Sequence, residues 1–298
     1  MPNDRINWYP GHMAKSRRLL QEQLRAVDAV IELCDARAPQ ATRNPDLNRL
    51  TREKTRILVL NKADLADDNQ TARWLEHFRR RGLTAMRFNS NGGKVKDILA
   101  HIEAASKPAL ERYAARGVRK TVRFMVIGIP NVGKSTFINR LHGSTIAKAG
   151  DRPGVTRANQ WVRIGPFLEI LDTPGMLPPR LDDQEGARLL AYLGSIRDEI
   201  MDTEALAGGL MALLHELNPA ALAAHYKLPE DCGGAPHELL EAACKGRGWL
   251  LPGGRYDTDR AAALVLDEFR AGRIGKITLQ NCRGASRPSE EIGVRSEE

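Results

Sequence analysis

The sequence predicts an α/β domain with a six-stranded, mostly parallel sheet and helices on both faces, followed by an all-helical domain. Between residues 27 and 175, near-continuous apolar runs typical of buried parallel strands alternate with helical segments. One of these strands leads into a glycine-rich phosphate-binding motif. Beyond Pro178 and Pro179 the apolar residues recur at helical spacing. We therefore expect a first domain over residues 1–178, a helical domain over 179–283 and a disordered polar tail over 284–298.

The first domain begins with a polar segment in which Pro10-Gly11 predicts a turn before a helix over 14–25. Leu20, Leu24 and Val27 fall on one face of that helix. Its basic residues fit either contact with RNA or an ordinary solvated surface. The elements expected next are a strand over 27–34, a strand over 55–60, a helix over 69–81, a strand over 83–88, a helix over 94–104, a helical connector over 107–120, a strand over 123–127, a helix over 137–141 and a hairpin of strands over 161–164 and 168–171.

The phosphate-binding motif is G-x-x-x-x-G-K-[ST] at residues 128–135, placed between a strand and a helix. Its glycines let backbone N–H groups turn toward phosphate oxygens. Lys134 can reach the β- and γ-phosphates, and the Ser135 hydroxyl can ligate Mg²⁺. The phosphate-binding residues expected here are Asn131, Val132, Gly133, Lys134, Ser135 and Thr136. The chain is therefore predicted to bind a nucleoside triphosphate.

The base is predicted from Asn61-Lys62-Ala63-Asp64, which follows a buried strand. A carboxylate at Asp64 can accept hydrogen bonds from N1–H and the exocyclic amine of guanine, and adenine offers neither donor in that geometry. Asn61 would brace the loop, and the stem of Lys62 would lie over the ring. Ser90 and Asn91, after the next strand, are expected to bring a backbone N–H to guanine O6, although any loop between a strand and a helix could look the same.

Two further segments complete a nucleotide site. Thr156 lies in a Gly/Pro-punctuated loop that the γ-phosphate and Mg²⁺ can order. Asp172-Thr-Pro-Gly175 ends a strand, so that Asp172 suits Mg²⁺ and the Gly175 N–H suits the γ-phosphate. The predicted Mg²⁺ ligands are Ser135, Thr156 and Asp172, and Lys134, Thr156 and Gly175 are the expected catalytic groups.

The charge and composition of the chain indicate what kind of partner it binds and in which compartment it works. The net charge is +8, and residues 1–125 hold 25 Lys and Arg against 14 Asp and Glu, whereas residues 201–298 carry a net charge of −4. A basic first domain suits nucleic acid, with a solvated surface as the alternative. The four cysteines form no C-x-x-C pair, and no apolar run is long enough for a membrane span. We therefore expect a cytoplasmic protein with reduced thiols.

The second domain is predicted to contain helices over 184–198, 203–217, 219–226, 236–244 and 257–271, and then a short strand over 276–279. This all-helical part is interpreted as a docking module for RNA. Because it has no excess of positive charge, we expect it to bind through its shape or through a local patch at Arg270, Arg273 and Lys276.

The phosphate loop, Thr156, Asp172-Thr-Pro-Gly175 and the NKAD segment together resemble the motif set of Ras-like GTPases, but here NKAD precedes the phosphate loop. Moving residues 122–175 ahead of 27–90 gives the usual strand order, so the domain is predicted to be a circularly permuted GTPase. The segments INWYPGHMAKSRR, VDAVIELCDARAP, GIPNVGKST, GDRPGVTR and DTPGM closely resemble the ribosome biogenesis GTPase A family. That resemblance implies GTP hydrolysis coupled to late maturation of the precursor of the large (50S) ribosomal subunit. Its rRNA and ribosomal proteins are the implied partners, the helical domain is then a docking module for RNA or the ribosome, and we expect a monomer.

Two departures from Ras-like proteins concern hydrolysis. Met176 stands where many carry a glutamine that orients the attacking water, so slow intrinsic hydrolysis is expected. His12 is a candidate to position that water, and it could equally contact RNA or cap the following helix. In related GTPases an asparagine at the position of Asn131 accompanies a potassium ion, which implies stimulation by K⁺. The alternative function is a slow guanine-nucleotide switch that recruits a protein partner outside the ribosome; an ATP-dependent enzyme is disfavoured by Asp64.

Overall fold

The structure, a computed structural model, describes residues 11–44, 47–51, 54–117, 121–143, 160–164, 168–173, 175, 184–196 and 202–282. Thr156, Met176 and the tail predicted over 284–298 lie outside these residues. His12 lies in the first turn of a helix, but its side chain is outside the described part.

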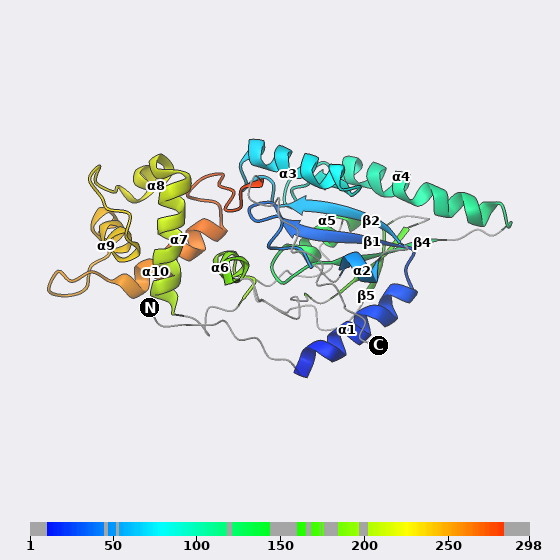
Figure 1. The fold of residues 1–298 in the computed structure, drawn as a ribbon, viewed down its shortest axis with the longest axis horizontal. Coiled ribbons are helices and arrows are strands. Elements are labelled where there is room, and N and C mark those ends of the chain that lie inside the picture. The colour runs from blue at the N-terminus through cyan, green and yellow to red at the C-terminus, as the bar shows by residue number, and fades with distance from the viewer. Residues whose placement is uncertain are drawn as a thin grey trace, which may run out of the picture.

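A single six-stranded sheet forms the centre of the first domain (Figure 1). Its spatial order is β3-β2-β1-β4-β6-β5, and every neighbouring pair is parallel except β5 with β6. This arrangement confirms the predicted mixed sheet. The strands are β1 (Ala29–Asp35), β2 (Thr55–Asn61), β3 (Thr84–Arg87), β4 (Val122–Ile127), β5 (Gln160–Arg163) and β6 (Leu168–Asp172).

The strand order also confirms the circular permutation. β4, the phosphate-loop strand, lies in the middle of the sheet between β1 and β6. The strands β4 to β6 form one side of the sheet and β1 to β3 form the other, so that the later part of the chain supplies the half that comes first in unpermuted GTPases. Because the carboxyl ends of parallel strands meet at one edge, the loops after β1, β2, β3, β4 and β6 converge there.

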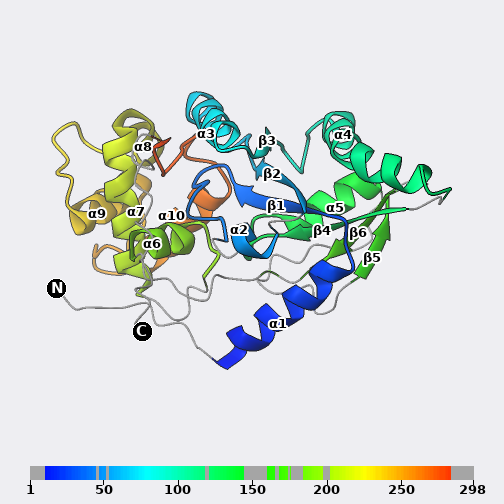
Figure 2. The ribbon, with the colours of Figure 1, turned by 45° about the vertical axis from the view of Figure 1, so that its right-hand side comes forward.

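Helices cover both faces of the sheet (Figure 2). Phe88 and Phe137 pack against the face that α4 and α5 cover, whereas α1, α2 and α3 pack on the other face through Leu20, Leu47 and Trp74. The helices are α1 (Gly11–Arg25), α2 (Leu47–Leu50), α3 (Asp68–Arg80), α4 (Val95–Ala114), α5 (Lys134–His142), α6 (Gln184–Tyr192), α7 (Thr203–Leu217), α8 (Pro219–Tyr226), α9 (Pro236–Arg247) and α10 (Thr258–Arg270). None of the described helices has the length and apolar content that crossing a membrane requires.

Several predicted boundaries differ from those of the structure. The first helix begins at Gly11, which was predicted to lie in a turn. α4 continues through Pro108 to Ala114 and absorbs most of the predicted connector, because Leu110 still packs on the sheet. α6 ends at Tyr192, since Gly194 takes a left-handed φ of +70° that interrupts the helix.

The helical domain has its own core, built from α6 to α10, and lies at one end of the sheet (Figure 1). The strand predicted over residues 276–279 does not form. Instead the segment lies against the first domain, where Ile277 N donates to Leu65 O (3.2 Å) and Leu279 N to Arg37 O (2.7 Å). Trp74 Nε1 also donates to Gln280 O (2.8 Å). Loop carbonyls thus accept from the backbone N–H groups of this segment, and a buried indole donates to its carbonyl. In a strand, a neighbouring strand would make these hydrogen bonds.

Candidate functional site

The phosphate loop lies directly after β4 and is shaped by residues with positive φ. Asn131 and Gly133 have φ of +63° and +92°, and Gly133 precedes the first turn of α5. A Cβ on Gly128 would lie 2.6 Å from Leu33 O, so only glycine fits where the loop crosses β1. The loop therefore directs the amino end of α5 toward the carboxyl edge of the sheet, as a phosphate site requires.

Lys134 lies inside this loop. Its Nζ donates to Gly128 O (3.0 Å) and Ile129 O (2.9 Å), and the residue is 7% exposed. Burial lowers the pKa of Lys134 to about 8, while the Asp172 carboxylate opposes that shift. A bound anion would place a further negative charge beside Lys134 and so favour its ammonium form.

Two of the three predicted Mg²⁺ ligands are brought together. The Asp172 carboxyl is hydrogen-bonded with the Ser135 side chain, and burial raises its pKa against the effect of Lys134. Asp172 Oδ1 is buried and has no hydrogen-bond partner among the described residues. An orphaned carboxylate oxygen beside a hydroxyl at the phosphate loop fits a hard divalent cation. The third predicted ligand, Thr156, lies outside the described residues.

Gly175 touches the phosphate loop. A Cβ at this position would lie 2.9 Å from Pro130 Cα and 3.0 Å from Lys134 Nζ. The glycine therefore lets the loop after β6 reach the place where a γ-phosphate would meet Lys134. This proximity agrees with the predicted role of the Gly175 N–H.

Asn61 joins the base loops to the phosphate loop. Its Nδ2 donates to Val132 O (2.8 Å), and its Oδ1 accepts from Ser90 N (3.1 Å) and Ser90 Oγ (2.7 Å). The Asn91 N–H donates to Asn89 Oδ1 (2.8 Å). Both N–H groups of the predicted O6 contact are thus engaged within the protein, and guanine O6 recognition by Ser90 and Asn91 stays a prediction.

Lys62 and Asp64 flank the expected base position. Lys62 has a φ of +56°, and its Nζ donates to Asn131 O (2.6 Å), so its stem extends toward the phosphate loop. Asp64 is half-buried, and its carboxylate makes no hydrogen bond within the described residues. These positions suit the predicted stacking and hydrogen-bonding roles.

A buried ion pair that we did not predict supports this loop. Asp35, at the end of β1, accepts from Arg37 Nε (3.0 Å) and Nη2 (2.9 Å), and Lys62 Nζ lies 3.2 Å from its Oδ2. Burial alone would raise the pKa of the Asp35 carboxyl, but Arg37 and Lys62 hold it well below its usual range. The sequence feature that could have indicated this ion pair is the Asp-Ala-Arg-Ala-Pro segment, which follows a buried strand.

The same arginine reaches the helical domain. Arg37 Nη1 donates to the carbonyls of Phe269 (3.1 Å) and Arg270 (3.2 Å) at the end of α10. Arg270 in turn donates to Tyr192 O (3.1 Å) and Ala191 O (2.8 Å) at the end of α6. After α6, Gly194 O accepts from Asn131 Nδ2 (2.6 Å) of the phosphate loop. The nucleotide loops and the helical domain are therefore joined by one series of buried and partly buried contacts.

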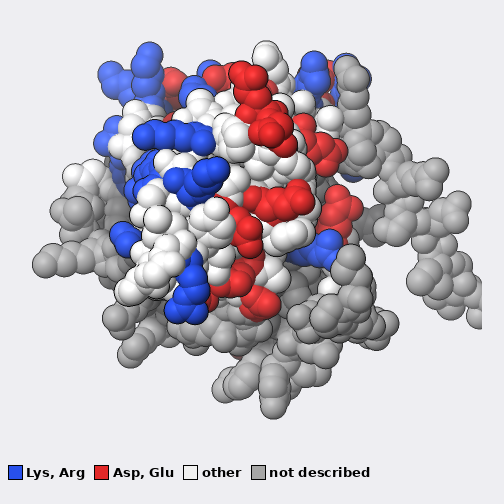
Figure 3. Space-filling view, turned by 90° about the vertical axis from the view of Figure 1, so that its left-hand side faces the viewer, with Lys and Arg blue, Asp and Glu red and all other residues white. Residues whose placement is uncertain are grey.

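Two of the three residues of the predicted basic patch on the helical domain make contacts within the protein, whereas Arg273 is exposed. Arg270 is directed inward, and Lys276 is paired with Asp68 of α3 (3.1 Å). Figure 3 shows this end of the molecule, where Asp and Glu side chains gather beside a separate group of Lys and Arg. The face does not present a uniformly basic surface.

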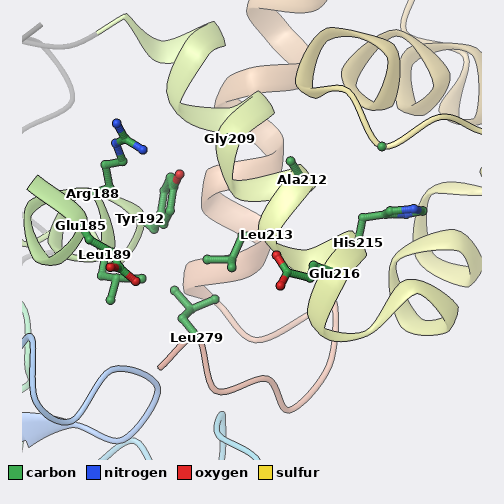
Figure 4. Close-up of a pocket in the computed structure, with 11 residues that line it drawn as sticks. Glu185, Arg188, Leu189, Tyr192, Gly209, Ala212, Leu213, His215, Glu216 and Leu279 are labelled. Carbon is green, nitrogen blue, oxygen red and sulfur yellow. The ribbon is translucent and has the colours of Figure 1, made fainter. Parts of the chain in front are cut away.

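A separate cavity of about 490 Å³ lies within the helical domain. Figure 4 shows Arg188 and Tyr192 of α6 on one side and Leu213 and Glu216 of α7 on the other, with Leu279 below them. None of the nucleotide-site residues that the structure describes lines it. No group of three or more His, Cys, Asp and Glu residues suited to a metal ion occurs in the described part of the chain.

Comparison with known proteins agrees with this site. Residues 123–205 match the family model described as 50S ribosome-binding GTPase. "Ribosome biogenesis GTPase A" of Bacillus cereus is 42% identical over 98% of this chain and 97% of that protein. A GDP-bound structure of YlqF has a TM-score of 0.68 at 27% identity, covering 89% of this chain and all of the other. GNP-bound YlqF from T. maritima has a TM-score of 0.62 at 28% identity, covering 90% of this chain and 98% of the other.

The matched region begins at the phosphate-loop strand, and the similarity to the B. cereus protein extends across both domains. The predicted resemblance, fold class and GTPase activity are thereby confirmed. With its permuted sheet and its nucleotide loops joined to a helical domain, the chain belongs to the ribosome biogenesis GTPase A family and is a GTP hydrolase.

Proposed function

We propose that this GTPase binds the precursor of the large ribosomal subunit in the cytoplasm and couples GTP hydrolysis to its late assembly. The observation that carries the proposal is the physical continuity between the nucleotide loops and the helical domain. Asn131 and Arg37 each bond to that domain while contacting the guanine-side Lys62 or its partner Asp35. A nucleotide-dependent change in these loops would therefore alter a domain suited to docking, over residues 179–283.

In the hydrolysis reaction Lys134 would bind the β- and γ-phosphates, and the Gly175 N–H would meet the γ-phosphate. Mg²⁺ would be held by Ser135, Thr156 and Asp172, and it would neutralise charge on the phosphate oxygens. Asp64 would select guanine. The absence of a glutamine at Met176 supports an intrinsic rate of about 10⁻³ s⁻¹ or below. The docked subunit would then complete the site.

The role of His12 and the dependence on K⁺ belong to the same proposal. Asn131 donates through Nδ2 to Gly194 O. Its side-chain oxygen Oδ1 stays available to a monovalent cation near the phosphates. Equal hydrolysis rates in K⁺ and Na⁺ would remove the cation from the proposal. His12 lies in the first turn of α1, after the N-terminal segment, and is proposed to position the attacking water.

The deciding experiment measures steady-state GTP hydrolysis by the wild type and His12→Ala, with and without purified large ribosomal subunits. We expect strong stimulation by the subunit, and its loss in His12→Ala with nucleotide affinity unchanged. Stimulation that survives in His12→Ala would remove the histidine but keep the function. No stimulation of the wild type would overturn the proposal and favour a guanine-nucleotide switch with a protein partner. The wild type is expected to sediment alone as a monomer.

A further inference from the structure

The edge of the sheet opposite the nucleotide site holds a second polar concavity. Its volume is about 340 Å³, and it lies where β1, β2 and β4 begin, between the ends of α1 and α4. β1 is seven residues long, which places this edge about 20 Å from the phosphate loop. Figures 1 and 2 show the ends of α1 and α4 on the side of the sheet away from the helical domain. The concavity is therefore distinct from the nucleotide site.

Four cationic side chains line this concavity: Arg25, Lys54, Arg112 and Arg116. Asp28 is the one carboxylate among the described lining residues, and its Oδ2 already accepts from Arg123 N (3.0 Å). Lys54 Nζ donates to Val27 O (2.6 Å). The lining thus has a clear excess of positive charge, and its single carboxylate is held by backbone.

The arginines retain donors for an external anion. Arg112 Nε donates to Pro108 O (3.2 Å), which leaves its two terminal nitrogens without a protein partner in the described residues. The side chains of Arg25 and Arg116 make no hydrogen bond or ion pair within that same part of the chain. All three arginines are exposed. A planar guanidinium with free donors matches the oxygens of a phosphate group.

We propose that this basic concavity, defined by Arg25, Lys54, Arg112 and Arg116, binds the phosphodiester backbone of RNA. A phosphate loop suits one small anion, which converging backbone N–H groups would enclose, whereas here the cations come from three separate elements around an open rim. Spread charges of this kind follow a chain of phosphates and do not read bases. The N-terminal part of the chain supplies the basic excess, and the helical end does not. The identity of the RNA rests on the proposed function, since a ribosomal subunit would present it.

The test compares the double variant Arg112→Ala, Arg116→Ala with the double variant Arg80→Ala, Lys96→Ala. The second pair removes the same charge from exposed positions on α3 and α4 outside the concavity. Binding to a 20-base-pair RNA duplex and to purified large subunits is measured across a range of KCl concentrations. Matching unfolding midpoints establish that both variants remain folded.

At about 0.1 M salt we expect the Arg112/Arg116 variant to bind the duplex roughly tenfold more weakly for each lost contact. The slope of log affinity against log salt should fall by about 2, with little change in the matched variant. An unchanged slope, or equal losses in both variants, would overturn the proposal. It would also be overturned if the variant lost inorganic pyrophosphate binding but kept RNA binding, because the concavity would then be a small-anion site.

Failure of this inference is distinguishable from failure of the proposed function. If the wild type binds subunits and the Arg112/Arg116 variant binds them equally well, the concavity has no role and the function stands. If the wild type binds the duplex through these arginines but no subunit, the concavity is an RNA site and the proposed function fails.

Discussion

The carboxyl and amino ends of the parallel strands form two edges of the sheet. Cations are buried and paired at the first edge, and exposed and unpaired among the described residues at the second. At the carboxyl edge, Arg37 is 1% exposed and bonded to Asp35, and Lys134 is enclosed by loop carbonyls. At the amino edge, Arg112 and Arg116 are exposed and keep free donors. Buried cations of the first kind fix loops in place, since leaving them or their partners alone in the interior is costly. Exposed cations of the second kind contribute little to stability and are available to a ligand.

The largest expected effect tests the buried side of this comparison. Arg37→Ala should lower the free energy of unfolding by about 3–5 kcal/mol, because it removes both guanidinium hydrogen bonds from the buried Asp35 carboxylate, which keeps the Lys62 ammonium and the backbone N–H of residue 37. Arg112→Ala, the matched change at the amino edge, should stay within about 0.5 kcal/mol of the wild type. Denaturant unfolding measures both. A loss below 1 kcal/mol for Arg37→Ala would break the comparison.

The next effect concerns guanine selection. Asp64→Asn should weaken GTP binding roughly 100-fold or more, because an amide cannot accept from both guanine donors. Xanthosine triphosphate should gain affinity, since its 2-carbonyl can accept from the new amide. Asp68→Asn removes the same charge from an exposed residue of α3 and should leave GTP affinity unchanged. Titration of each variant with both nucleotides decides the matter, and unchanged GTP binding by Asp64→Asn would refute the assignment.

A smaller effect follows from the lowered pKa of Lys134, which is about 8. Phosphate binding favours the ammonium form, so the nucleotide complex should take up a proton when it forms above pH 8. GTP affinity should be nearly constant from pH 7 to 8 and should then fall, approaching tenfold per pH unit. Calorimetric titration in two buffers of different ionisation enthalpy measures the proton directly. Absence of proton uptake at pH 9 would show that Lys134 does not titrate there.

The smallest effect isolates the contact between the phosphate loop and the helical domain. Asn131→Gly keeps the positive φ but removes the donor to Gly194 O, so unfolding should become easier by about 1 kcal/mol. Asn131→Ala should cost about 1 kcal/mol more, since alanine disfavours a left-handed backbone. Denaturant unfolding distinguishes the three proteins. Equal stability of the glycine variant and the wild type would mean that this contact contributes nothing.

Short motifs at strand ends made much of the site predictable. The phosphate loop and NKAD each depend on a local strand and turn, so a few consecutive residues specify the geometry. The partners of Arg37 could not be predicted in the same way, because Phe269 O lies 232 residues further along the chain. Glu32, placed in the middle of an apolar strand, is likewise explained by distant cations, namely Arg43 (3.0 Å) of the following loop and Arg56 (3.9 Å) of β2.

The C-terminal segment shows a different limit. Residues 276–279 have the composition of a short strand, yet no strand of the described residues pairs with them. Leu65 and Arg37 offer carbonyls at that place, and the chain takes these instead. Composition indicates that a segment will be extended, but only the tertiary structure shows where its hydrogen bonds go.

The contacts around Arg37 form a closed circuit. It runs from Asn131 to Gly194, through the end of α6 to Arg270, on to Arg37 and Asp35, and back through Lys62 to Asn131. Two sites on such a circuit obey thermodynamic reciprocity. If a bound nucleotide changes the affinity of the helical domain for a ligand by some free energy, that ligand must change the affinity for the nucleotide by the same free energy.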